Sequence, residues 1–339
     1  MRPADDVGKV DDMAAAPLLQ VRKLRVEFPT RRGTLRALDD VSFDIAPGEI
    51  LGVVGESGAG KSLTGAAIIG LLEPPGRIAA GEILLAGQRI DQLPPEAMRK
   101  IRGRRIGAIF QDPLTSLNPL FTIGRQISET VQVHLGLNAA DARRRAIQLL
   151  ADTGIPAPEQ RFDQYPHQFS GGMRQRVVIA LALAAGPELI VADEPTTALD
   201  VSIQAQIIAL LKKLTKQQGA AVMLVTHDMG VIAEACDRVA VMYAGRVVEI
   251  GPVADVIHRP AHPYTVGLMG AIPAMDGERE RLAQIDGAMP RLTAIPTGCA
   301  FNPRCPQVQP RCRSERPELL GAGATRAACW LHEAAAVAA

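Results

Sequence analysis

The sequence has few aromatic residues and no excess of charge of either sign. Trp, Tyr and Phe make up 3% of its 339 residues, which argues against the aromatic stacking surfaces that bind single-stranded nucleic acid. The 37 Lys and Arg residues nearly balance the 36 Asp and Glu residues, and the formal net charge is +1. This balance argues against a generally basic protein that coats nucleic acid, so no nucleic-acid partner is expected.

Long apolar runs are also missing. The N-terminal stretch MRPADDVGKVDDMAAAP contains acidic residues and no continuous apolar segment, so we do not expect a secretory signal and predict a disordered leader over 1–17. The most apolar stretch, VVIALALAAGP (177–187), is too short to span a bilayer. We therefore expect a cytosolic protein, and structural disulfides are rare in that compartment.

From residue 18 onward, segments of strand length alternate with helical patterns. The predicted strands are LLQVRKLRVEF (18–28), LRALDDVSFDI (35–45), ILGVVG (50–55), RIGAIFQ (105–111), ELIVADE (188–194), AVMLVTHD (221–228) and RVAVMYAG (238–245). The predicted helices include SLTGAAIIGLL, AADARRRAIQLLADTG and VSIQAQIIALLKKLTKQQG. Continuous apolar strands that alternate with helices indicate an α/β domain with a mostly parallel sheet. The composition changes near residue 260, so we predict a main domain over 18–260 and a smaller, proline-rich extension over 261–339.

The stretch GESGAGKS (55–62) matches the phosphate-binding pattern G-x-x-x-x-G-K-[ST]. A predicted strand precedes it and a predicted helix follows it, which is the context that the pattern requires. Its glycines would let backbone N–H groups surround phosphate oxygens, beside the positive end of the helix dipole. Lys61 would reach the β- and γ-phosphates, and the Ser62 hydroxyl would bind Mg²⁺. The alternative, a glycine-rich turn with a surface lysine, does not account for the complete pattern.

Two carboxylates end the predicted strand ELIVADEP (188–195), at the edge of the sheet where α/β proteins place ligands. We expect Asp193 to hold Mg²⁺, directly or through water, and Glu194 to polarise an attacking water. Alone, the segment would read equally well as a buried strand that ends in solvated acids. The phosphate loop elsewhere in the chain favours the catalytic interpretation.

A second anion-binding device lies at FSGGMRQR (169–176), where Ser-Gly-Gly precedes a long apolar helix. The alternative is a simple capped helix start. Two phosphate-binding helix ends far apart in sequence are unusual for one nucleotide site. They are explained if each subunit completes the site of its partner.

Together these motifs resemble the ATP-binding cassette (ABC) ATPases over residues 18–260. The resemblance implies a P-loop NTPase fold of the α/β class, with a parallel-sheet core, an antiparallel β subdomain and a helical subdomain over about 112–180. It implies ATP hydrolysis with Mg²⁺, and it places Phe28 against the adenine. The residues expected around the phosphates are Gly55, Glu56, Ser57, Gly58, Ala59, Gly60, Lys61, Ser62 and Leu63.

The same resemblance assigns roles to four further motifs. Gln111 matches the Q-loop glutamine that approaches the metal and the γ-phosphate, so Ser62, Gln111 and Asp193 are the expected Mg²⁺ site. His227 matches the switch histidine that contacts the γ-phosphate, and Asp200 matches the D-loop. The residues expected to close over the ATP of the other subunit are Ser170, Gly171 and Gly172. The common family signature is LSGGQ, whereas this chain reads FSGGM and has its glutamine at Gln175, which puts that one contact in doubt.

Three segments resemble the oligopeptide/dipeptide/nickel importer branch: 109–124 around the Q-loop, 259–273 after the cassette, and the cysteine-containing tail that opens with GCAFNPRCP. This branch implies a peripheral subunit on the cytoplasmic face of the inner membrane that powers peptide uptake, with nickel or another small solute as the alternative. The implied partners are two membrane permeases, a second ABC ATPase (a paralogue or a second copy) and, indirectly, an extracytoplasmic substrate-binding protein. Competing interpretations are a soluble ABC ATPase of translation or DNA repair, and a metal or redox sensor built on the tail.

Four of the five cysteines lie in the tail: Cys299, Cys305, Cys312 and Cys329. Their spacers are longer than those of common zinc sites, which contain tight pairs of ligands. Four cysteines with such spacers in a loop-rich segment can hold either Zn²⁺ or a [4Fe–4S] cluster. The alternative is four free thiols. The resemblance favours the [4Fe–4S] cluster. The fifth cysteine, Cys236, is interpreted as a small core residue. The basic run RKIRGRR (99–105) is interpreted equally as a contact to partners or lipid headgroups and as a solvated surface.

Overall fold

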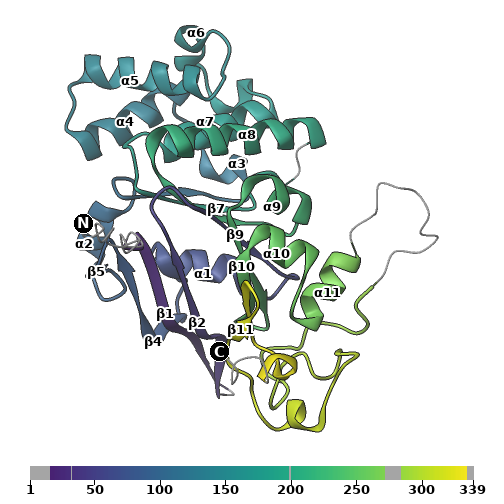
Figure 1. Ribbon diagram of the computed structural model, residues 1–339. Helices are drawn as coiled ribbons and strands as arrows, with labels where there is room; N and C mark the ends of the chain where they lie inside the picture. Colours follow the sequence, from purple (N-terminus) through teal and green to yellow (C-terminus); the bar gives the residue numbers. More distant parts are fainter. Residues whose placement is uncertain (1–15, 32, 198–199, 272–283, 334–339) are drawn as a thin grey trace, which may run out of the picture.

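The computed structural model describes residues 16–31, 33–197, 200–271 and 284–333, so almost all of the predicted leader lies outside the described residues. Its strands form two sheets (Figure 1). The smaller sheet is antiparallel, with the order β2-β1-β4-β5. Its strands are β1 (Leu19–Thr30), β2 (Gly33–Ile45), β4 (Arg77–Leu85) and β5 (Gln88–Arg89).

The larger sheet has the order β11-β12-β10-β9-β3-β8-β7-β6. Its parallel strands are β3 (Ile50–Val54), β6 (Ile106–Ile109), β7 (Leu189–Asp193), β8 (Ala221–Val225) and β9 (Arg238–Tyr243). Every residue of β3 and β8 is buried. Strands covered on both faces need continuous apolar sequence, and the predicted parallel core of an α/β domain is confirmed.

The helices fall into two groups (Figure 1). The first, at the top of the figure, contains α3 (Pro113–Ser116), α4 (Ile123–Leu135), α5 (Ala139–Asp152), α6 (Pro158–Phe162) and α7 (Gly171–Ala182). Helix α8 (Val201–Gln218) lies beside α7 in the same view. The second group accompanies the sheets and the extension, and contains α1 (Lys61–Ile68), α2 (Pro95–Ile101), α9 (Met229–Ala235), α10 (Val253–His258) and α11 (Pro263–Gly270). The side chains of Thr122 and Asn138 cap α4 and α5 by accepting backbone N–H groups, which fixes where these helices begin.

The extension is joined to the main sheet, an arrangement that the sequence did not indicate. It contributes β11 (Leu320–Ala322) and β12 (Thr325–Ala327), and β12 pairs antiparallel with β10 (Arg246–Pro252), with Glu249 opposite Ala327. Three-residue strands are too short to show any periodicity, which explains why they were not predicted. The extension lies at the opposite end of the molecule from α4–α6 (Figure 1).

A buried carboxylate strengthens this connection. Glu249 is fully buried, and its two oxygens accept the backbone N–H groups of Ala261 and His262 at 2.8 and 2.9 Å. These residues open the segment that leads from the cassette into the extension. Further on, Tyr264 packs against Tyr243 of β9 and Phe301 of the extension, with ring centroids 4.7 and 5.4 Å away.

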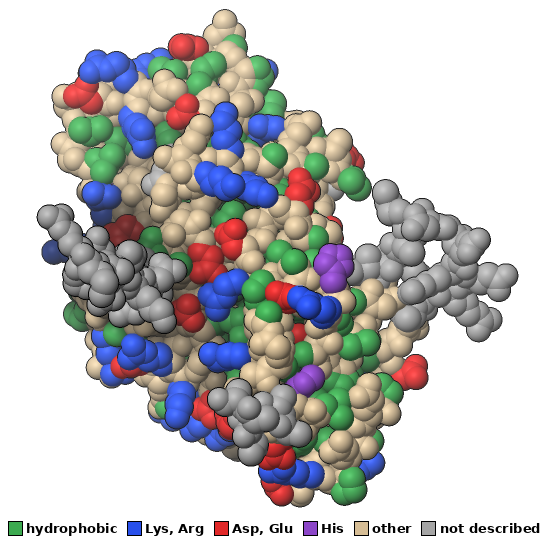
Figure 2. Space-filling view, viewed as in Figure 1, with side chains coloured by type: hydrophobic (Ala, Val, Ile, Leu, Met, Phe, Trp, Pro, Cys, Tyr) green, Lys and Arg blue, Asp and Glu red, His purple; other side chains and the backbone are tan. Residues whose placement is uncertain are grey.

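The surface fits the balanced composition. On the face shown in Figure 2, Lys and Arg side chains alternate with Asp and Glu side chains. No helix within the described ranges is both long and apolar enough to cross a membrane.

We predict that Glu249→Gln lowers the free energy of unfolding by about 1.5–3 kcal/mol, because it replaces two charge-assisted hydrogen bonds in a buried position. Urea unfolding measures this change. Glu318→Gln is the control, because the Glu318 side chain is 76% exposed and its replacement should change stability by less than about 0.5 kcal/mol. Equal effects of the two substitutions would contradict the prediction.

Candidate active site

The loop between β3 and α1 follows a path that only glycine allows at two of its positions. Gly55 has φ 150°, and a Cβ atom there would lie 2.2 Å from the carbonyl oxygen of Met242. Gly60, the residue before α1, has φ 101°, and its Cβ would lie 2.6 Å from the Leu38 side chain. Because both positions have left-handed backbone and no room for a side chain, the glycines of the motif fix the shape of this loop.

Lys61 folds back over the loop. Its Nζ donates hydrogen bonds to the carbonyl oxygens of Gly55 at 2.8 Å and Glu56 at 3.1 Å. Burial lowers the pKa of Lys61, while the nearby carboxylates of Glu194 and Asp193 oppose that shift. Lys61 is the first residue of α1. Its buried ammonium group and the N-terminus of the helix therefore both favour an anion beside this loop.

Asp193 ends β7 and faces the phosphate loop. Its Oδ1 accepts a hydrogen bond from the Ser62 hydroxyl at 2.9 Å. Burial raises the pKa of Asp193; the Ser62 bond opposes the shift, and the adjacent Glu194 charge adds to it. A hydroxyl and a carboxylate in contact supply the oxygen ligands that Mg²⁺ prefers.

Glu194 follows with a left-handed backbone, φ 46°, and its side chain has three polar partners. Gln111 Nε2 and Thr197 Oγ1 donate to its Oε2 at 3.1 and 2.8 Å, and His227 Nδ1 lies 3.3 Å from its Oε1. Burial alone would raise the pKa of Glu194, but the hydrogen bonds with Thr197 and His227 and the nearby charge of Lys61 outweigh it and hold the pKa below its ordinary value. Glu194 is therefore held as an ionised, oriented acceptor.

A cavity of about 610 Å³ lies among Lys61, Ser62, Gln111, Glu194 and His227, whereas Asp193 lines a neighbouring cavity. Its lining contains the predicted residues Ser57, Gly58, Gly60, Lys61, Ser62, Leu63, Gln111, Glu194 and His227. Gly55, Glu56 and Ala59 belong to the same loop, and Ala59 is fully buried. Two lining residues were not predicted: Ala37 of β2, and Leu292, which reaches the cavity from the extension. Thr197 was also missed, although its place in a tight turn three residues after Glu194 is a local signal.

Phe28 does not line this cavity. It lies beside a neighbouring cavity of about 350 Å³, which shares Ser62 and Leu63 with the first. Its expected stacking on adenine stays a prediction.

The predicted partner-facing residues are also separate from the cavity. Ser170 caps α7 by accepting the Met173 N–H, Gly171 and Gly172 form its first turn, and Asp200 precedes α8. None of them lines the cavity, so their action on another subunit's nucleotide stays a prediction. Gln175 is only 1% exposed, and its position inside α7 prevents it from replacing the missing signature glutamine at the surface.

The four tail cysteines line one pocket, together with His262 and Trp330. All four are free thiols, and burial raises the pKa of Cys299 to about 11 and also raises the pKa of Cys305 and Cys329. In the described part of the chain, no group of three or more His, Cys, Asp or Glu side chains is arranged so that it could hold a metal ion. The structure therefore brings the cysteines together but does not support the predicted [4Fe–4S] or Zn²⁺ centre. Cys236 is buried next to α9, as expected of a core residue.

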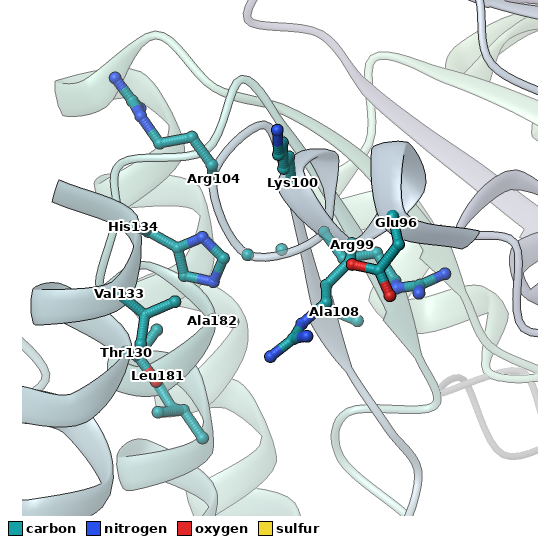
Figure 3. A pocket seen from close by; sticks show the side chains of 13 residues that line it. Glu96, Arg99, Lys100, Arg104, Ala108, Thr130, Val133, His134, Leu181 and Ala182 are labelled. Atoms are coloured by element: carbon teal, nitrogen blue, oxygen red, sulfur yellow. The ribbon is translucent and has the colours of Figure 1, made fainter. Parts of the chain in front are cut away.

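The basic run 99–105 borders a third cavity, of about 850 Å³. In Figure 3, Val133 and His134 lie on one side of it, and Glu96, Arg99 and Lys100 on the other. Arg104 donates to the carbonyl oxygen of Ala185, so part of the run is structural. Burial, and then the Arg104 charge, lower the pKa of His134.

The fold and the site together define an ATPase of the ABC class. Residues 38–197 match the family described as ABC transporter, and residues 248–312 match the family described as Oligopeptide/dipeptide transporter, C-terminal region. The chain belongs to the ATP-binding proteins of ABC transporters, in the branch that carries this oligopeptide/dipeptide C-terminal region. ATP and Mg²⁺ are the substrate and metal expected of that class.

Curated relatives match over almost their whole length. The dipeptide transport ATP-binding protein DppD of Escherichia coli is 49% identical over 302 residues, which cover 89% of this chain and 92% of that protein. The oligopeptide transport ATP-binding protein OppD of Salmonella typhimurium is 46% identical over 311 residues, which cover 91% and 92%.

Among solved structures, the ATP-binding cassette MJ0796, dimeric in a post-hydrolysis state with ADP and Pi, is 30% identical. It superposes with a TM-score of 0.63 over 69% of this chain and 98% of that one. The predicted fold class is confirmed.

Proposed function

We propose that this chain binds and hydrolyses ATP to power an ABC importer of dipeptides or oligopeptides. One observation supports the ATPase part most strongly: the Glu194 carboxylate is held by Gln111, Thr197 and His227, in the cavity that Lys61 and Ser62 also line. The names of the relatives and the C-terminal family match support peptide import. Nickel or another small solute is the second candidate. A soluble, non-transport ABC ATPase is the least favoured, because of that C-terminal match.

The proposed reaction is in-line attack of water on the γ-phosphate. Glu194 accepts a hydrogen bond from the attacking water, and His227 contacts the γ-phosphate from the end of the neighbouring strand. Lys61 and the loop amides stabilise the charge on the β- and γ-phosphates. Ser62, Gln111 and Asp193 would hold Mg²⁺, which would supply positive charge to stabilise the phosphate oxygens.

A working unit contains two cassettes in this proposal. Ser170, Gly171 and Gly172 act at the nucleotide of a second ABC ATPase, either a paralogue or a second copy, and Asp200 lies at the same interface. A structurally similar cassette was solved as a dimer, which supports this arrangement. We assign the cassette to 18–260, its helical subdomain to about 112–180, and the extension to 261–339.

The membrane partners follow from the class of transporter. We infer that two permease subunits hold the chain peripherally at the cytoplasmic face of the membrane, and that an extracytoplasmic binding protein delivers the substrate. The cavity beside the basic run 99–105 is one candidate contact for a permease or for lipid headgroups.

The cysteine pocket has a separate proposed role, as the site of a [4Fe–4S] cluster or of Zn²⁺. Its support is chemical: four thiols from distant parts of the extension line one pocket. Their present arrangement does not hold a metal ion. The proposed hydrolysis therefore does not depend on this group.

We expect Glu194→Gln to bind ATP but to hydrolyse it about 10²–10⁴ times more slowly, because the amide cannot accept a proton from water. Steady-state phosphate release and binding of a fluorescent ATP analogue measure the two properties. Glu188→Gln, at the residue just before strand β7, is the matched control and should keep most of the activity. Near-normal hydrolysis by Glu194→Gln would remove Glu194 from this role.

A strain that lacks this chain should lose uptake of a radiolabelled dipeptide or oligopeptide. Uptake should return with the wild-type chain but not with Glu194→Gln, because transport requires hydrolysis. Radioactive nickel is measured in parallel. If peptide uptake is unchanged and nickel uptake is lost, the substrate is nickel instead.

Protein purified without oxygen should contain roughly four iron atoms per chain and absorb near about 400 nm, as cysteine-bound iron–sulfur centres do. Replacement of Cys312 by Ser should remove both signals. Stoichiometric zinc in colourless protein would assign the pocket to Zn²⁺, and four titratable thiols without metal would refute a metal site.

A further inference from the structure

Arg304 of the extension forms an ion pair with the phosphate loop. Arg304 Nη1 and Nη2 donate to Glu56 Oε2 and Oε1 at 3.0 and 3.1 Å, a bidentate ion pair between residues 248 positions apart. The Arg304 side chain is 7% exposed and that of Glu56 is 28% exposed, so water screens this pair less than an ordinary surface pair. Glu56 is the second residue of the glycine-rich loop.

Other contacts fix Arg304 on the side of the extension. Its Nε donates to the carbonyl oxygen of Asp286 at 2.8 Å, and its Nη2 also donates to that of Ile285 at 3.2 Å. The chain continues from Asp286 to Leu292, which lines the cavity beside the phosphate loop. A guanidinium has five N–H donors in a rigid fork, so one side chain can join the loop and this segment in a fixed geometry.

The backbone of Glu56 is held from the extension as well. Its N–H donates to the Tyr264 hydroxyl at 2.8 Å, and Tyr264 is fully buried against Tyr243 and Phe301. On its other side, the carbonyl oxygen of Glu56 accepts the hydrogen bond from Lys61. The residue that orients the lysine ammonium is therefore fixed at its side chain by Arg304 and at its N–H by Tyr264.

We propose that Arg304 and Tyr264 are positioning residues for the phosphate loop, through which the extension sets the affinity of the cassette for ATP. They touch no reacting atom in this proposal. They hold the loop in one conformation before ATP arrives, which lowers the entropy lost on binding. The inference rests on the proposed assignment of this loop as the ATP site.

If Arg304 only attached the extension to the cassette, its loss would affect ATP binding differently. Arg316 also joins the extension to the cassette, through Asp39 at 2.7 Å and Asp40 at 2.9 Å, but it does not contact the phosphate loop. If Arg304 only attached the extension, then loss of either arginine would have the same effect on ATP binding. If Arg304 positions the loop, only its loss weakens binding. Arg316→Gln is therefore the matched control.

The test measures binding of a fluorescent ATP analogue, KM and kcat on full-length protein with Arg304→Gln, Glu56→Gln and both together. We expect each single change to raise Kd and KM about tenfold, kcat at saturating ATP to stay within about twofold, and the double variant to be no worse than either single one. Arg304→Lys should recover part of the affinity. Arg316→Gln should bind ATP as the wild type does.

Unchanged affinity in Arg304→Gln, additive effects in the double variant, or an equal loss in Arg316→Gln would each overturn the inference. If Arg304→Gln does not fold, Tyr264→Phe removes only the hydroxyl and should raise Kd about threefold; an unchanged Kd would refute the proposal. Lys61→Ala distinguishes failure of the proposed ATP site from failure of the proposed role of Arg304. If it still binds ATP, the proposed ATP site is wrong; if it loses binding while Arg304→Gln keeps it, only this inference fails.

Discussion

The functional site depends on four neighbouring parallel strands that end at the same edge of one sheet. β3 leads into the phosphate loop, β7 ends in Asp193 and Glu194, β8 leads to His227, and β6 leads to Gln111. Because parallel strands present their carboxyl ends together, residues from four distant parts of the chain meet around one cavity. The strands can keep this order only because both of their faces are buried, which requires their apolar sequences.

Much of this could be predicted from the sequence, and for physical reasons. Buried strands such as β3 and β8 are continuous apolar runs, and the phosphate loop needs glycine at Gly55 and Gly60, where a side chain would collide with the neighbouring strands. The colliding groups, Met242 and Leu38, lie elsewhere in the sequence, but the glycines themselves fall within the short motif 55–62 and so leave a local pattern. The carboxylates at the end of β7 follow the same logic, because their position on the strand determines where they point.

The contacts from the extension left no local pattern. The pair between Arg304 and Glu56 depends on how the chain returns to the sheet through β11 and β12, which are three residues long. Tyr264 contacts Glu56 of the phosphate loop and Leu292 lines the cavity, although both lie far from the loop in the sequence. The arrangement of the cysteines also depends on tertiary structure: their spacing predicted a metal centre, yet in the described residues they share a pocket without forming a metal-holding group.

The two parts of the chain therefore depend on each other more closely than a boundary near residue 260 suggests. β12 extends the sheet that carries the phosphate loop, and Glu249 of that sheet holds the segment that leads into the extension. Arg304 and Tyr264, both in the extension, bind Glu56 of the phosphate loop, and the carbonyl oxygen of Glu56 accepts a hydrogen bond from Lys61. Two contacts in series connect Arg304 of the extension to Lys61: the ion pair between Arg304 and Glu56, and the hydrogen bond from Lys61 to Glu56. A displacement of the extension would therefore move the lysine ammonium. A cassette built in this way has a phosphate loop whose shape depends on a segment nearly 250 residues later in the chain.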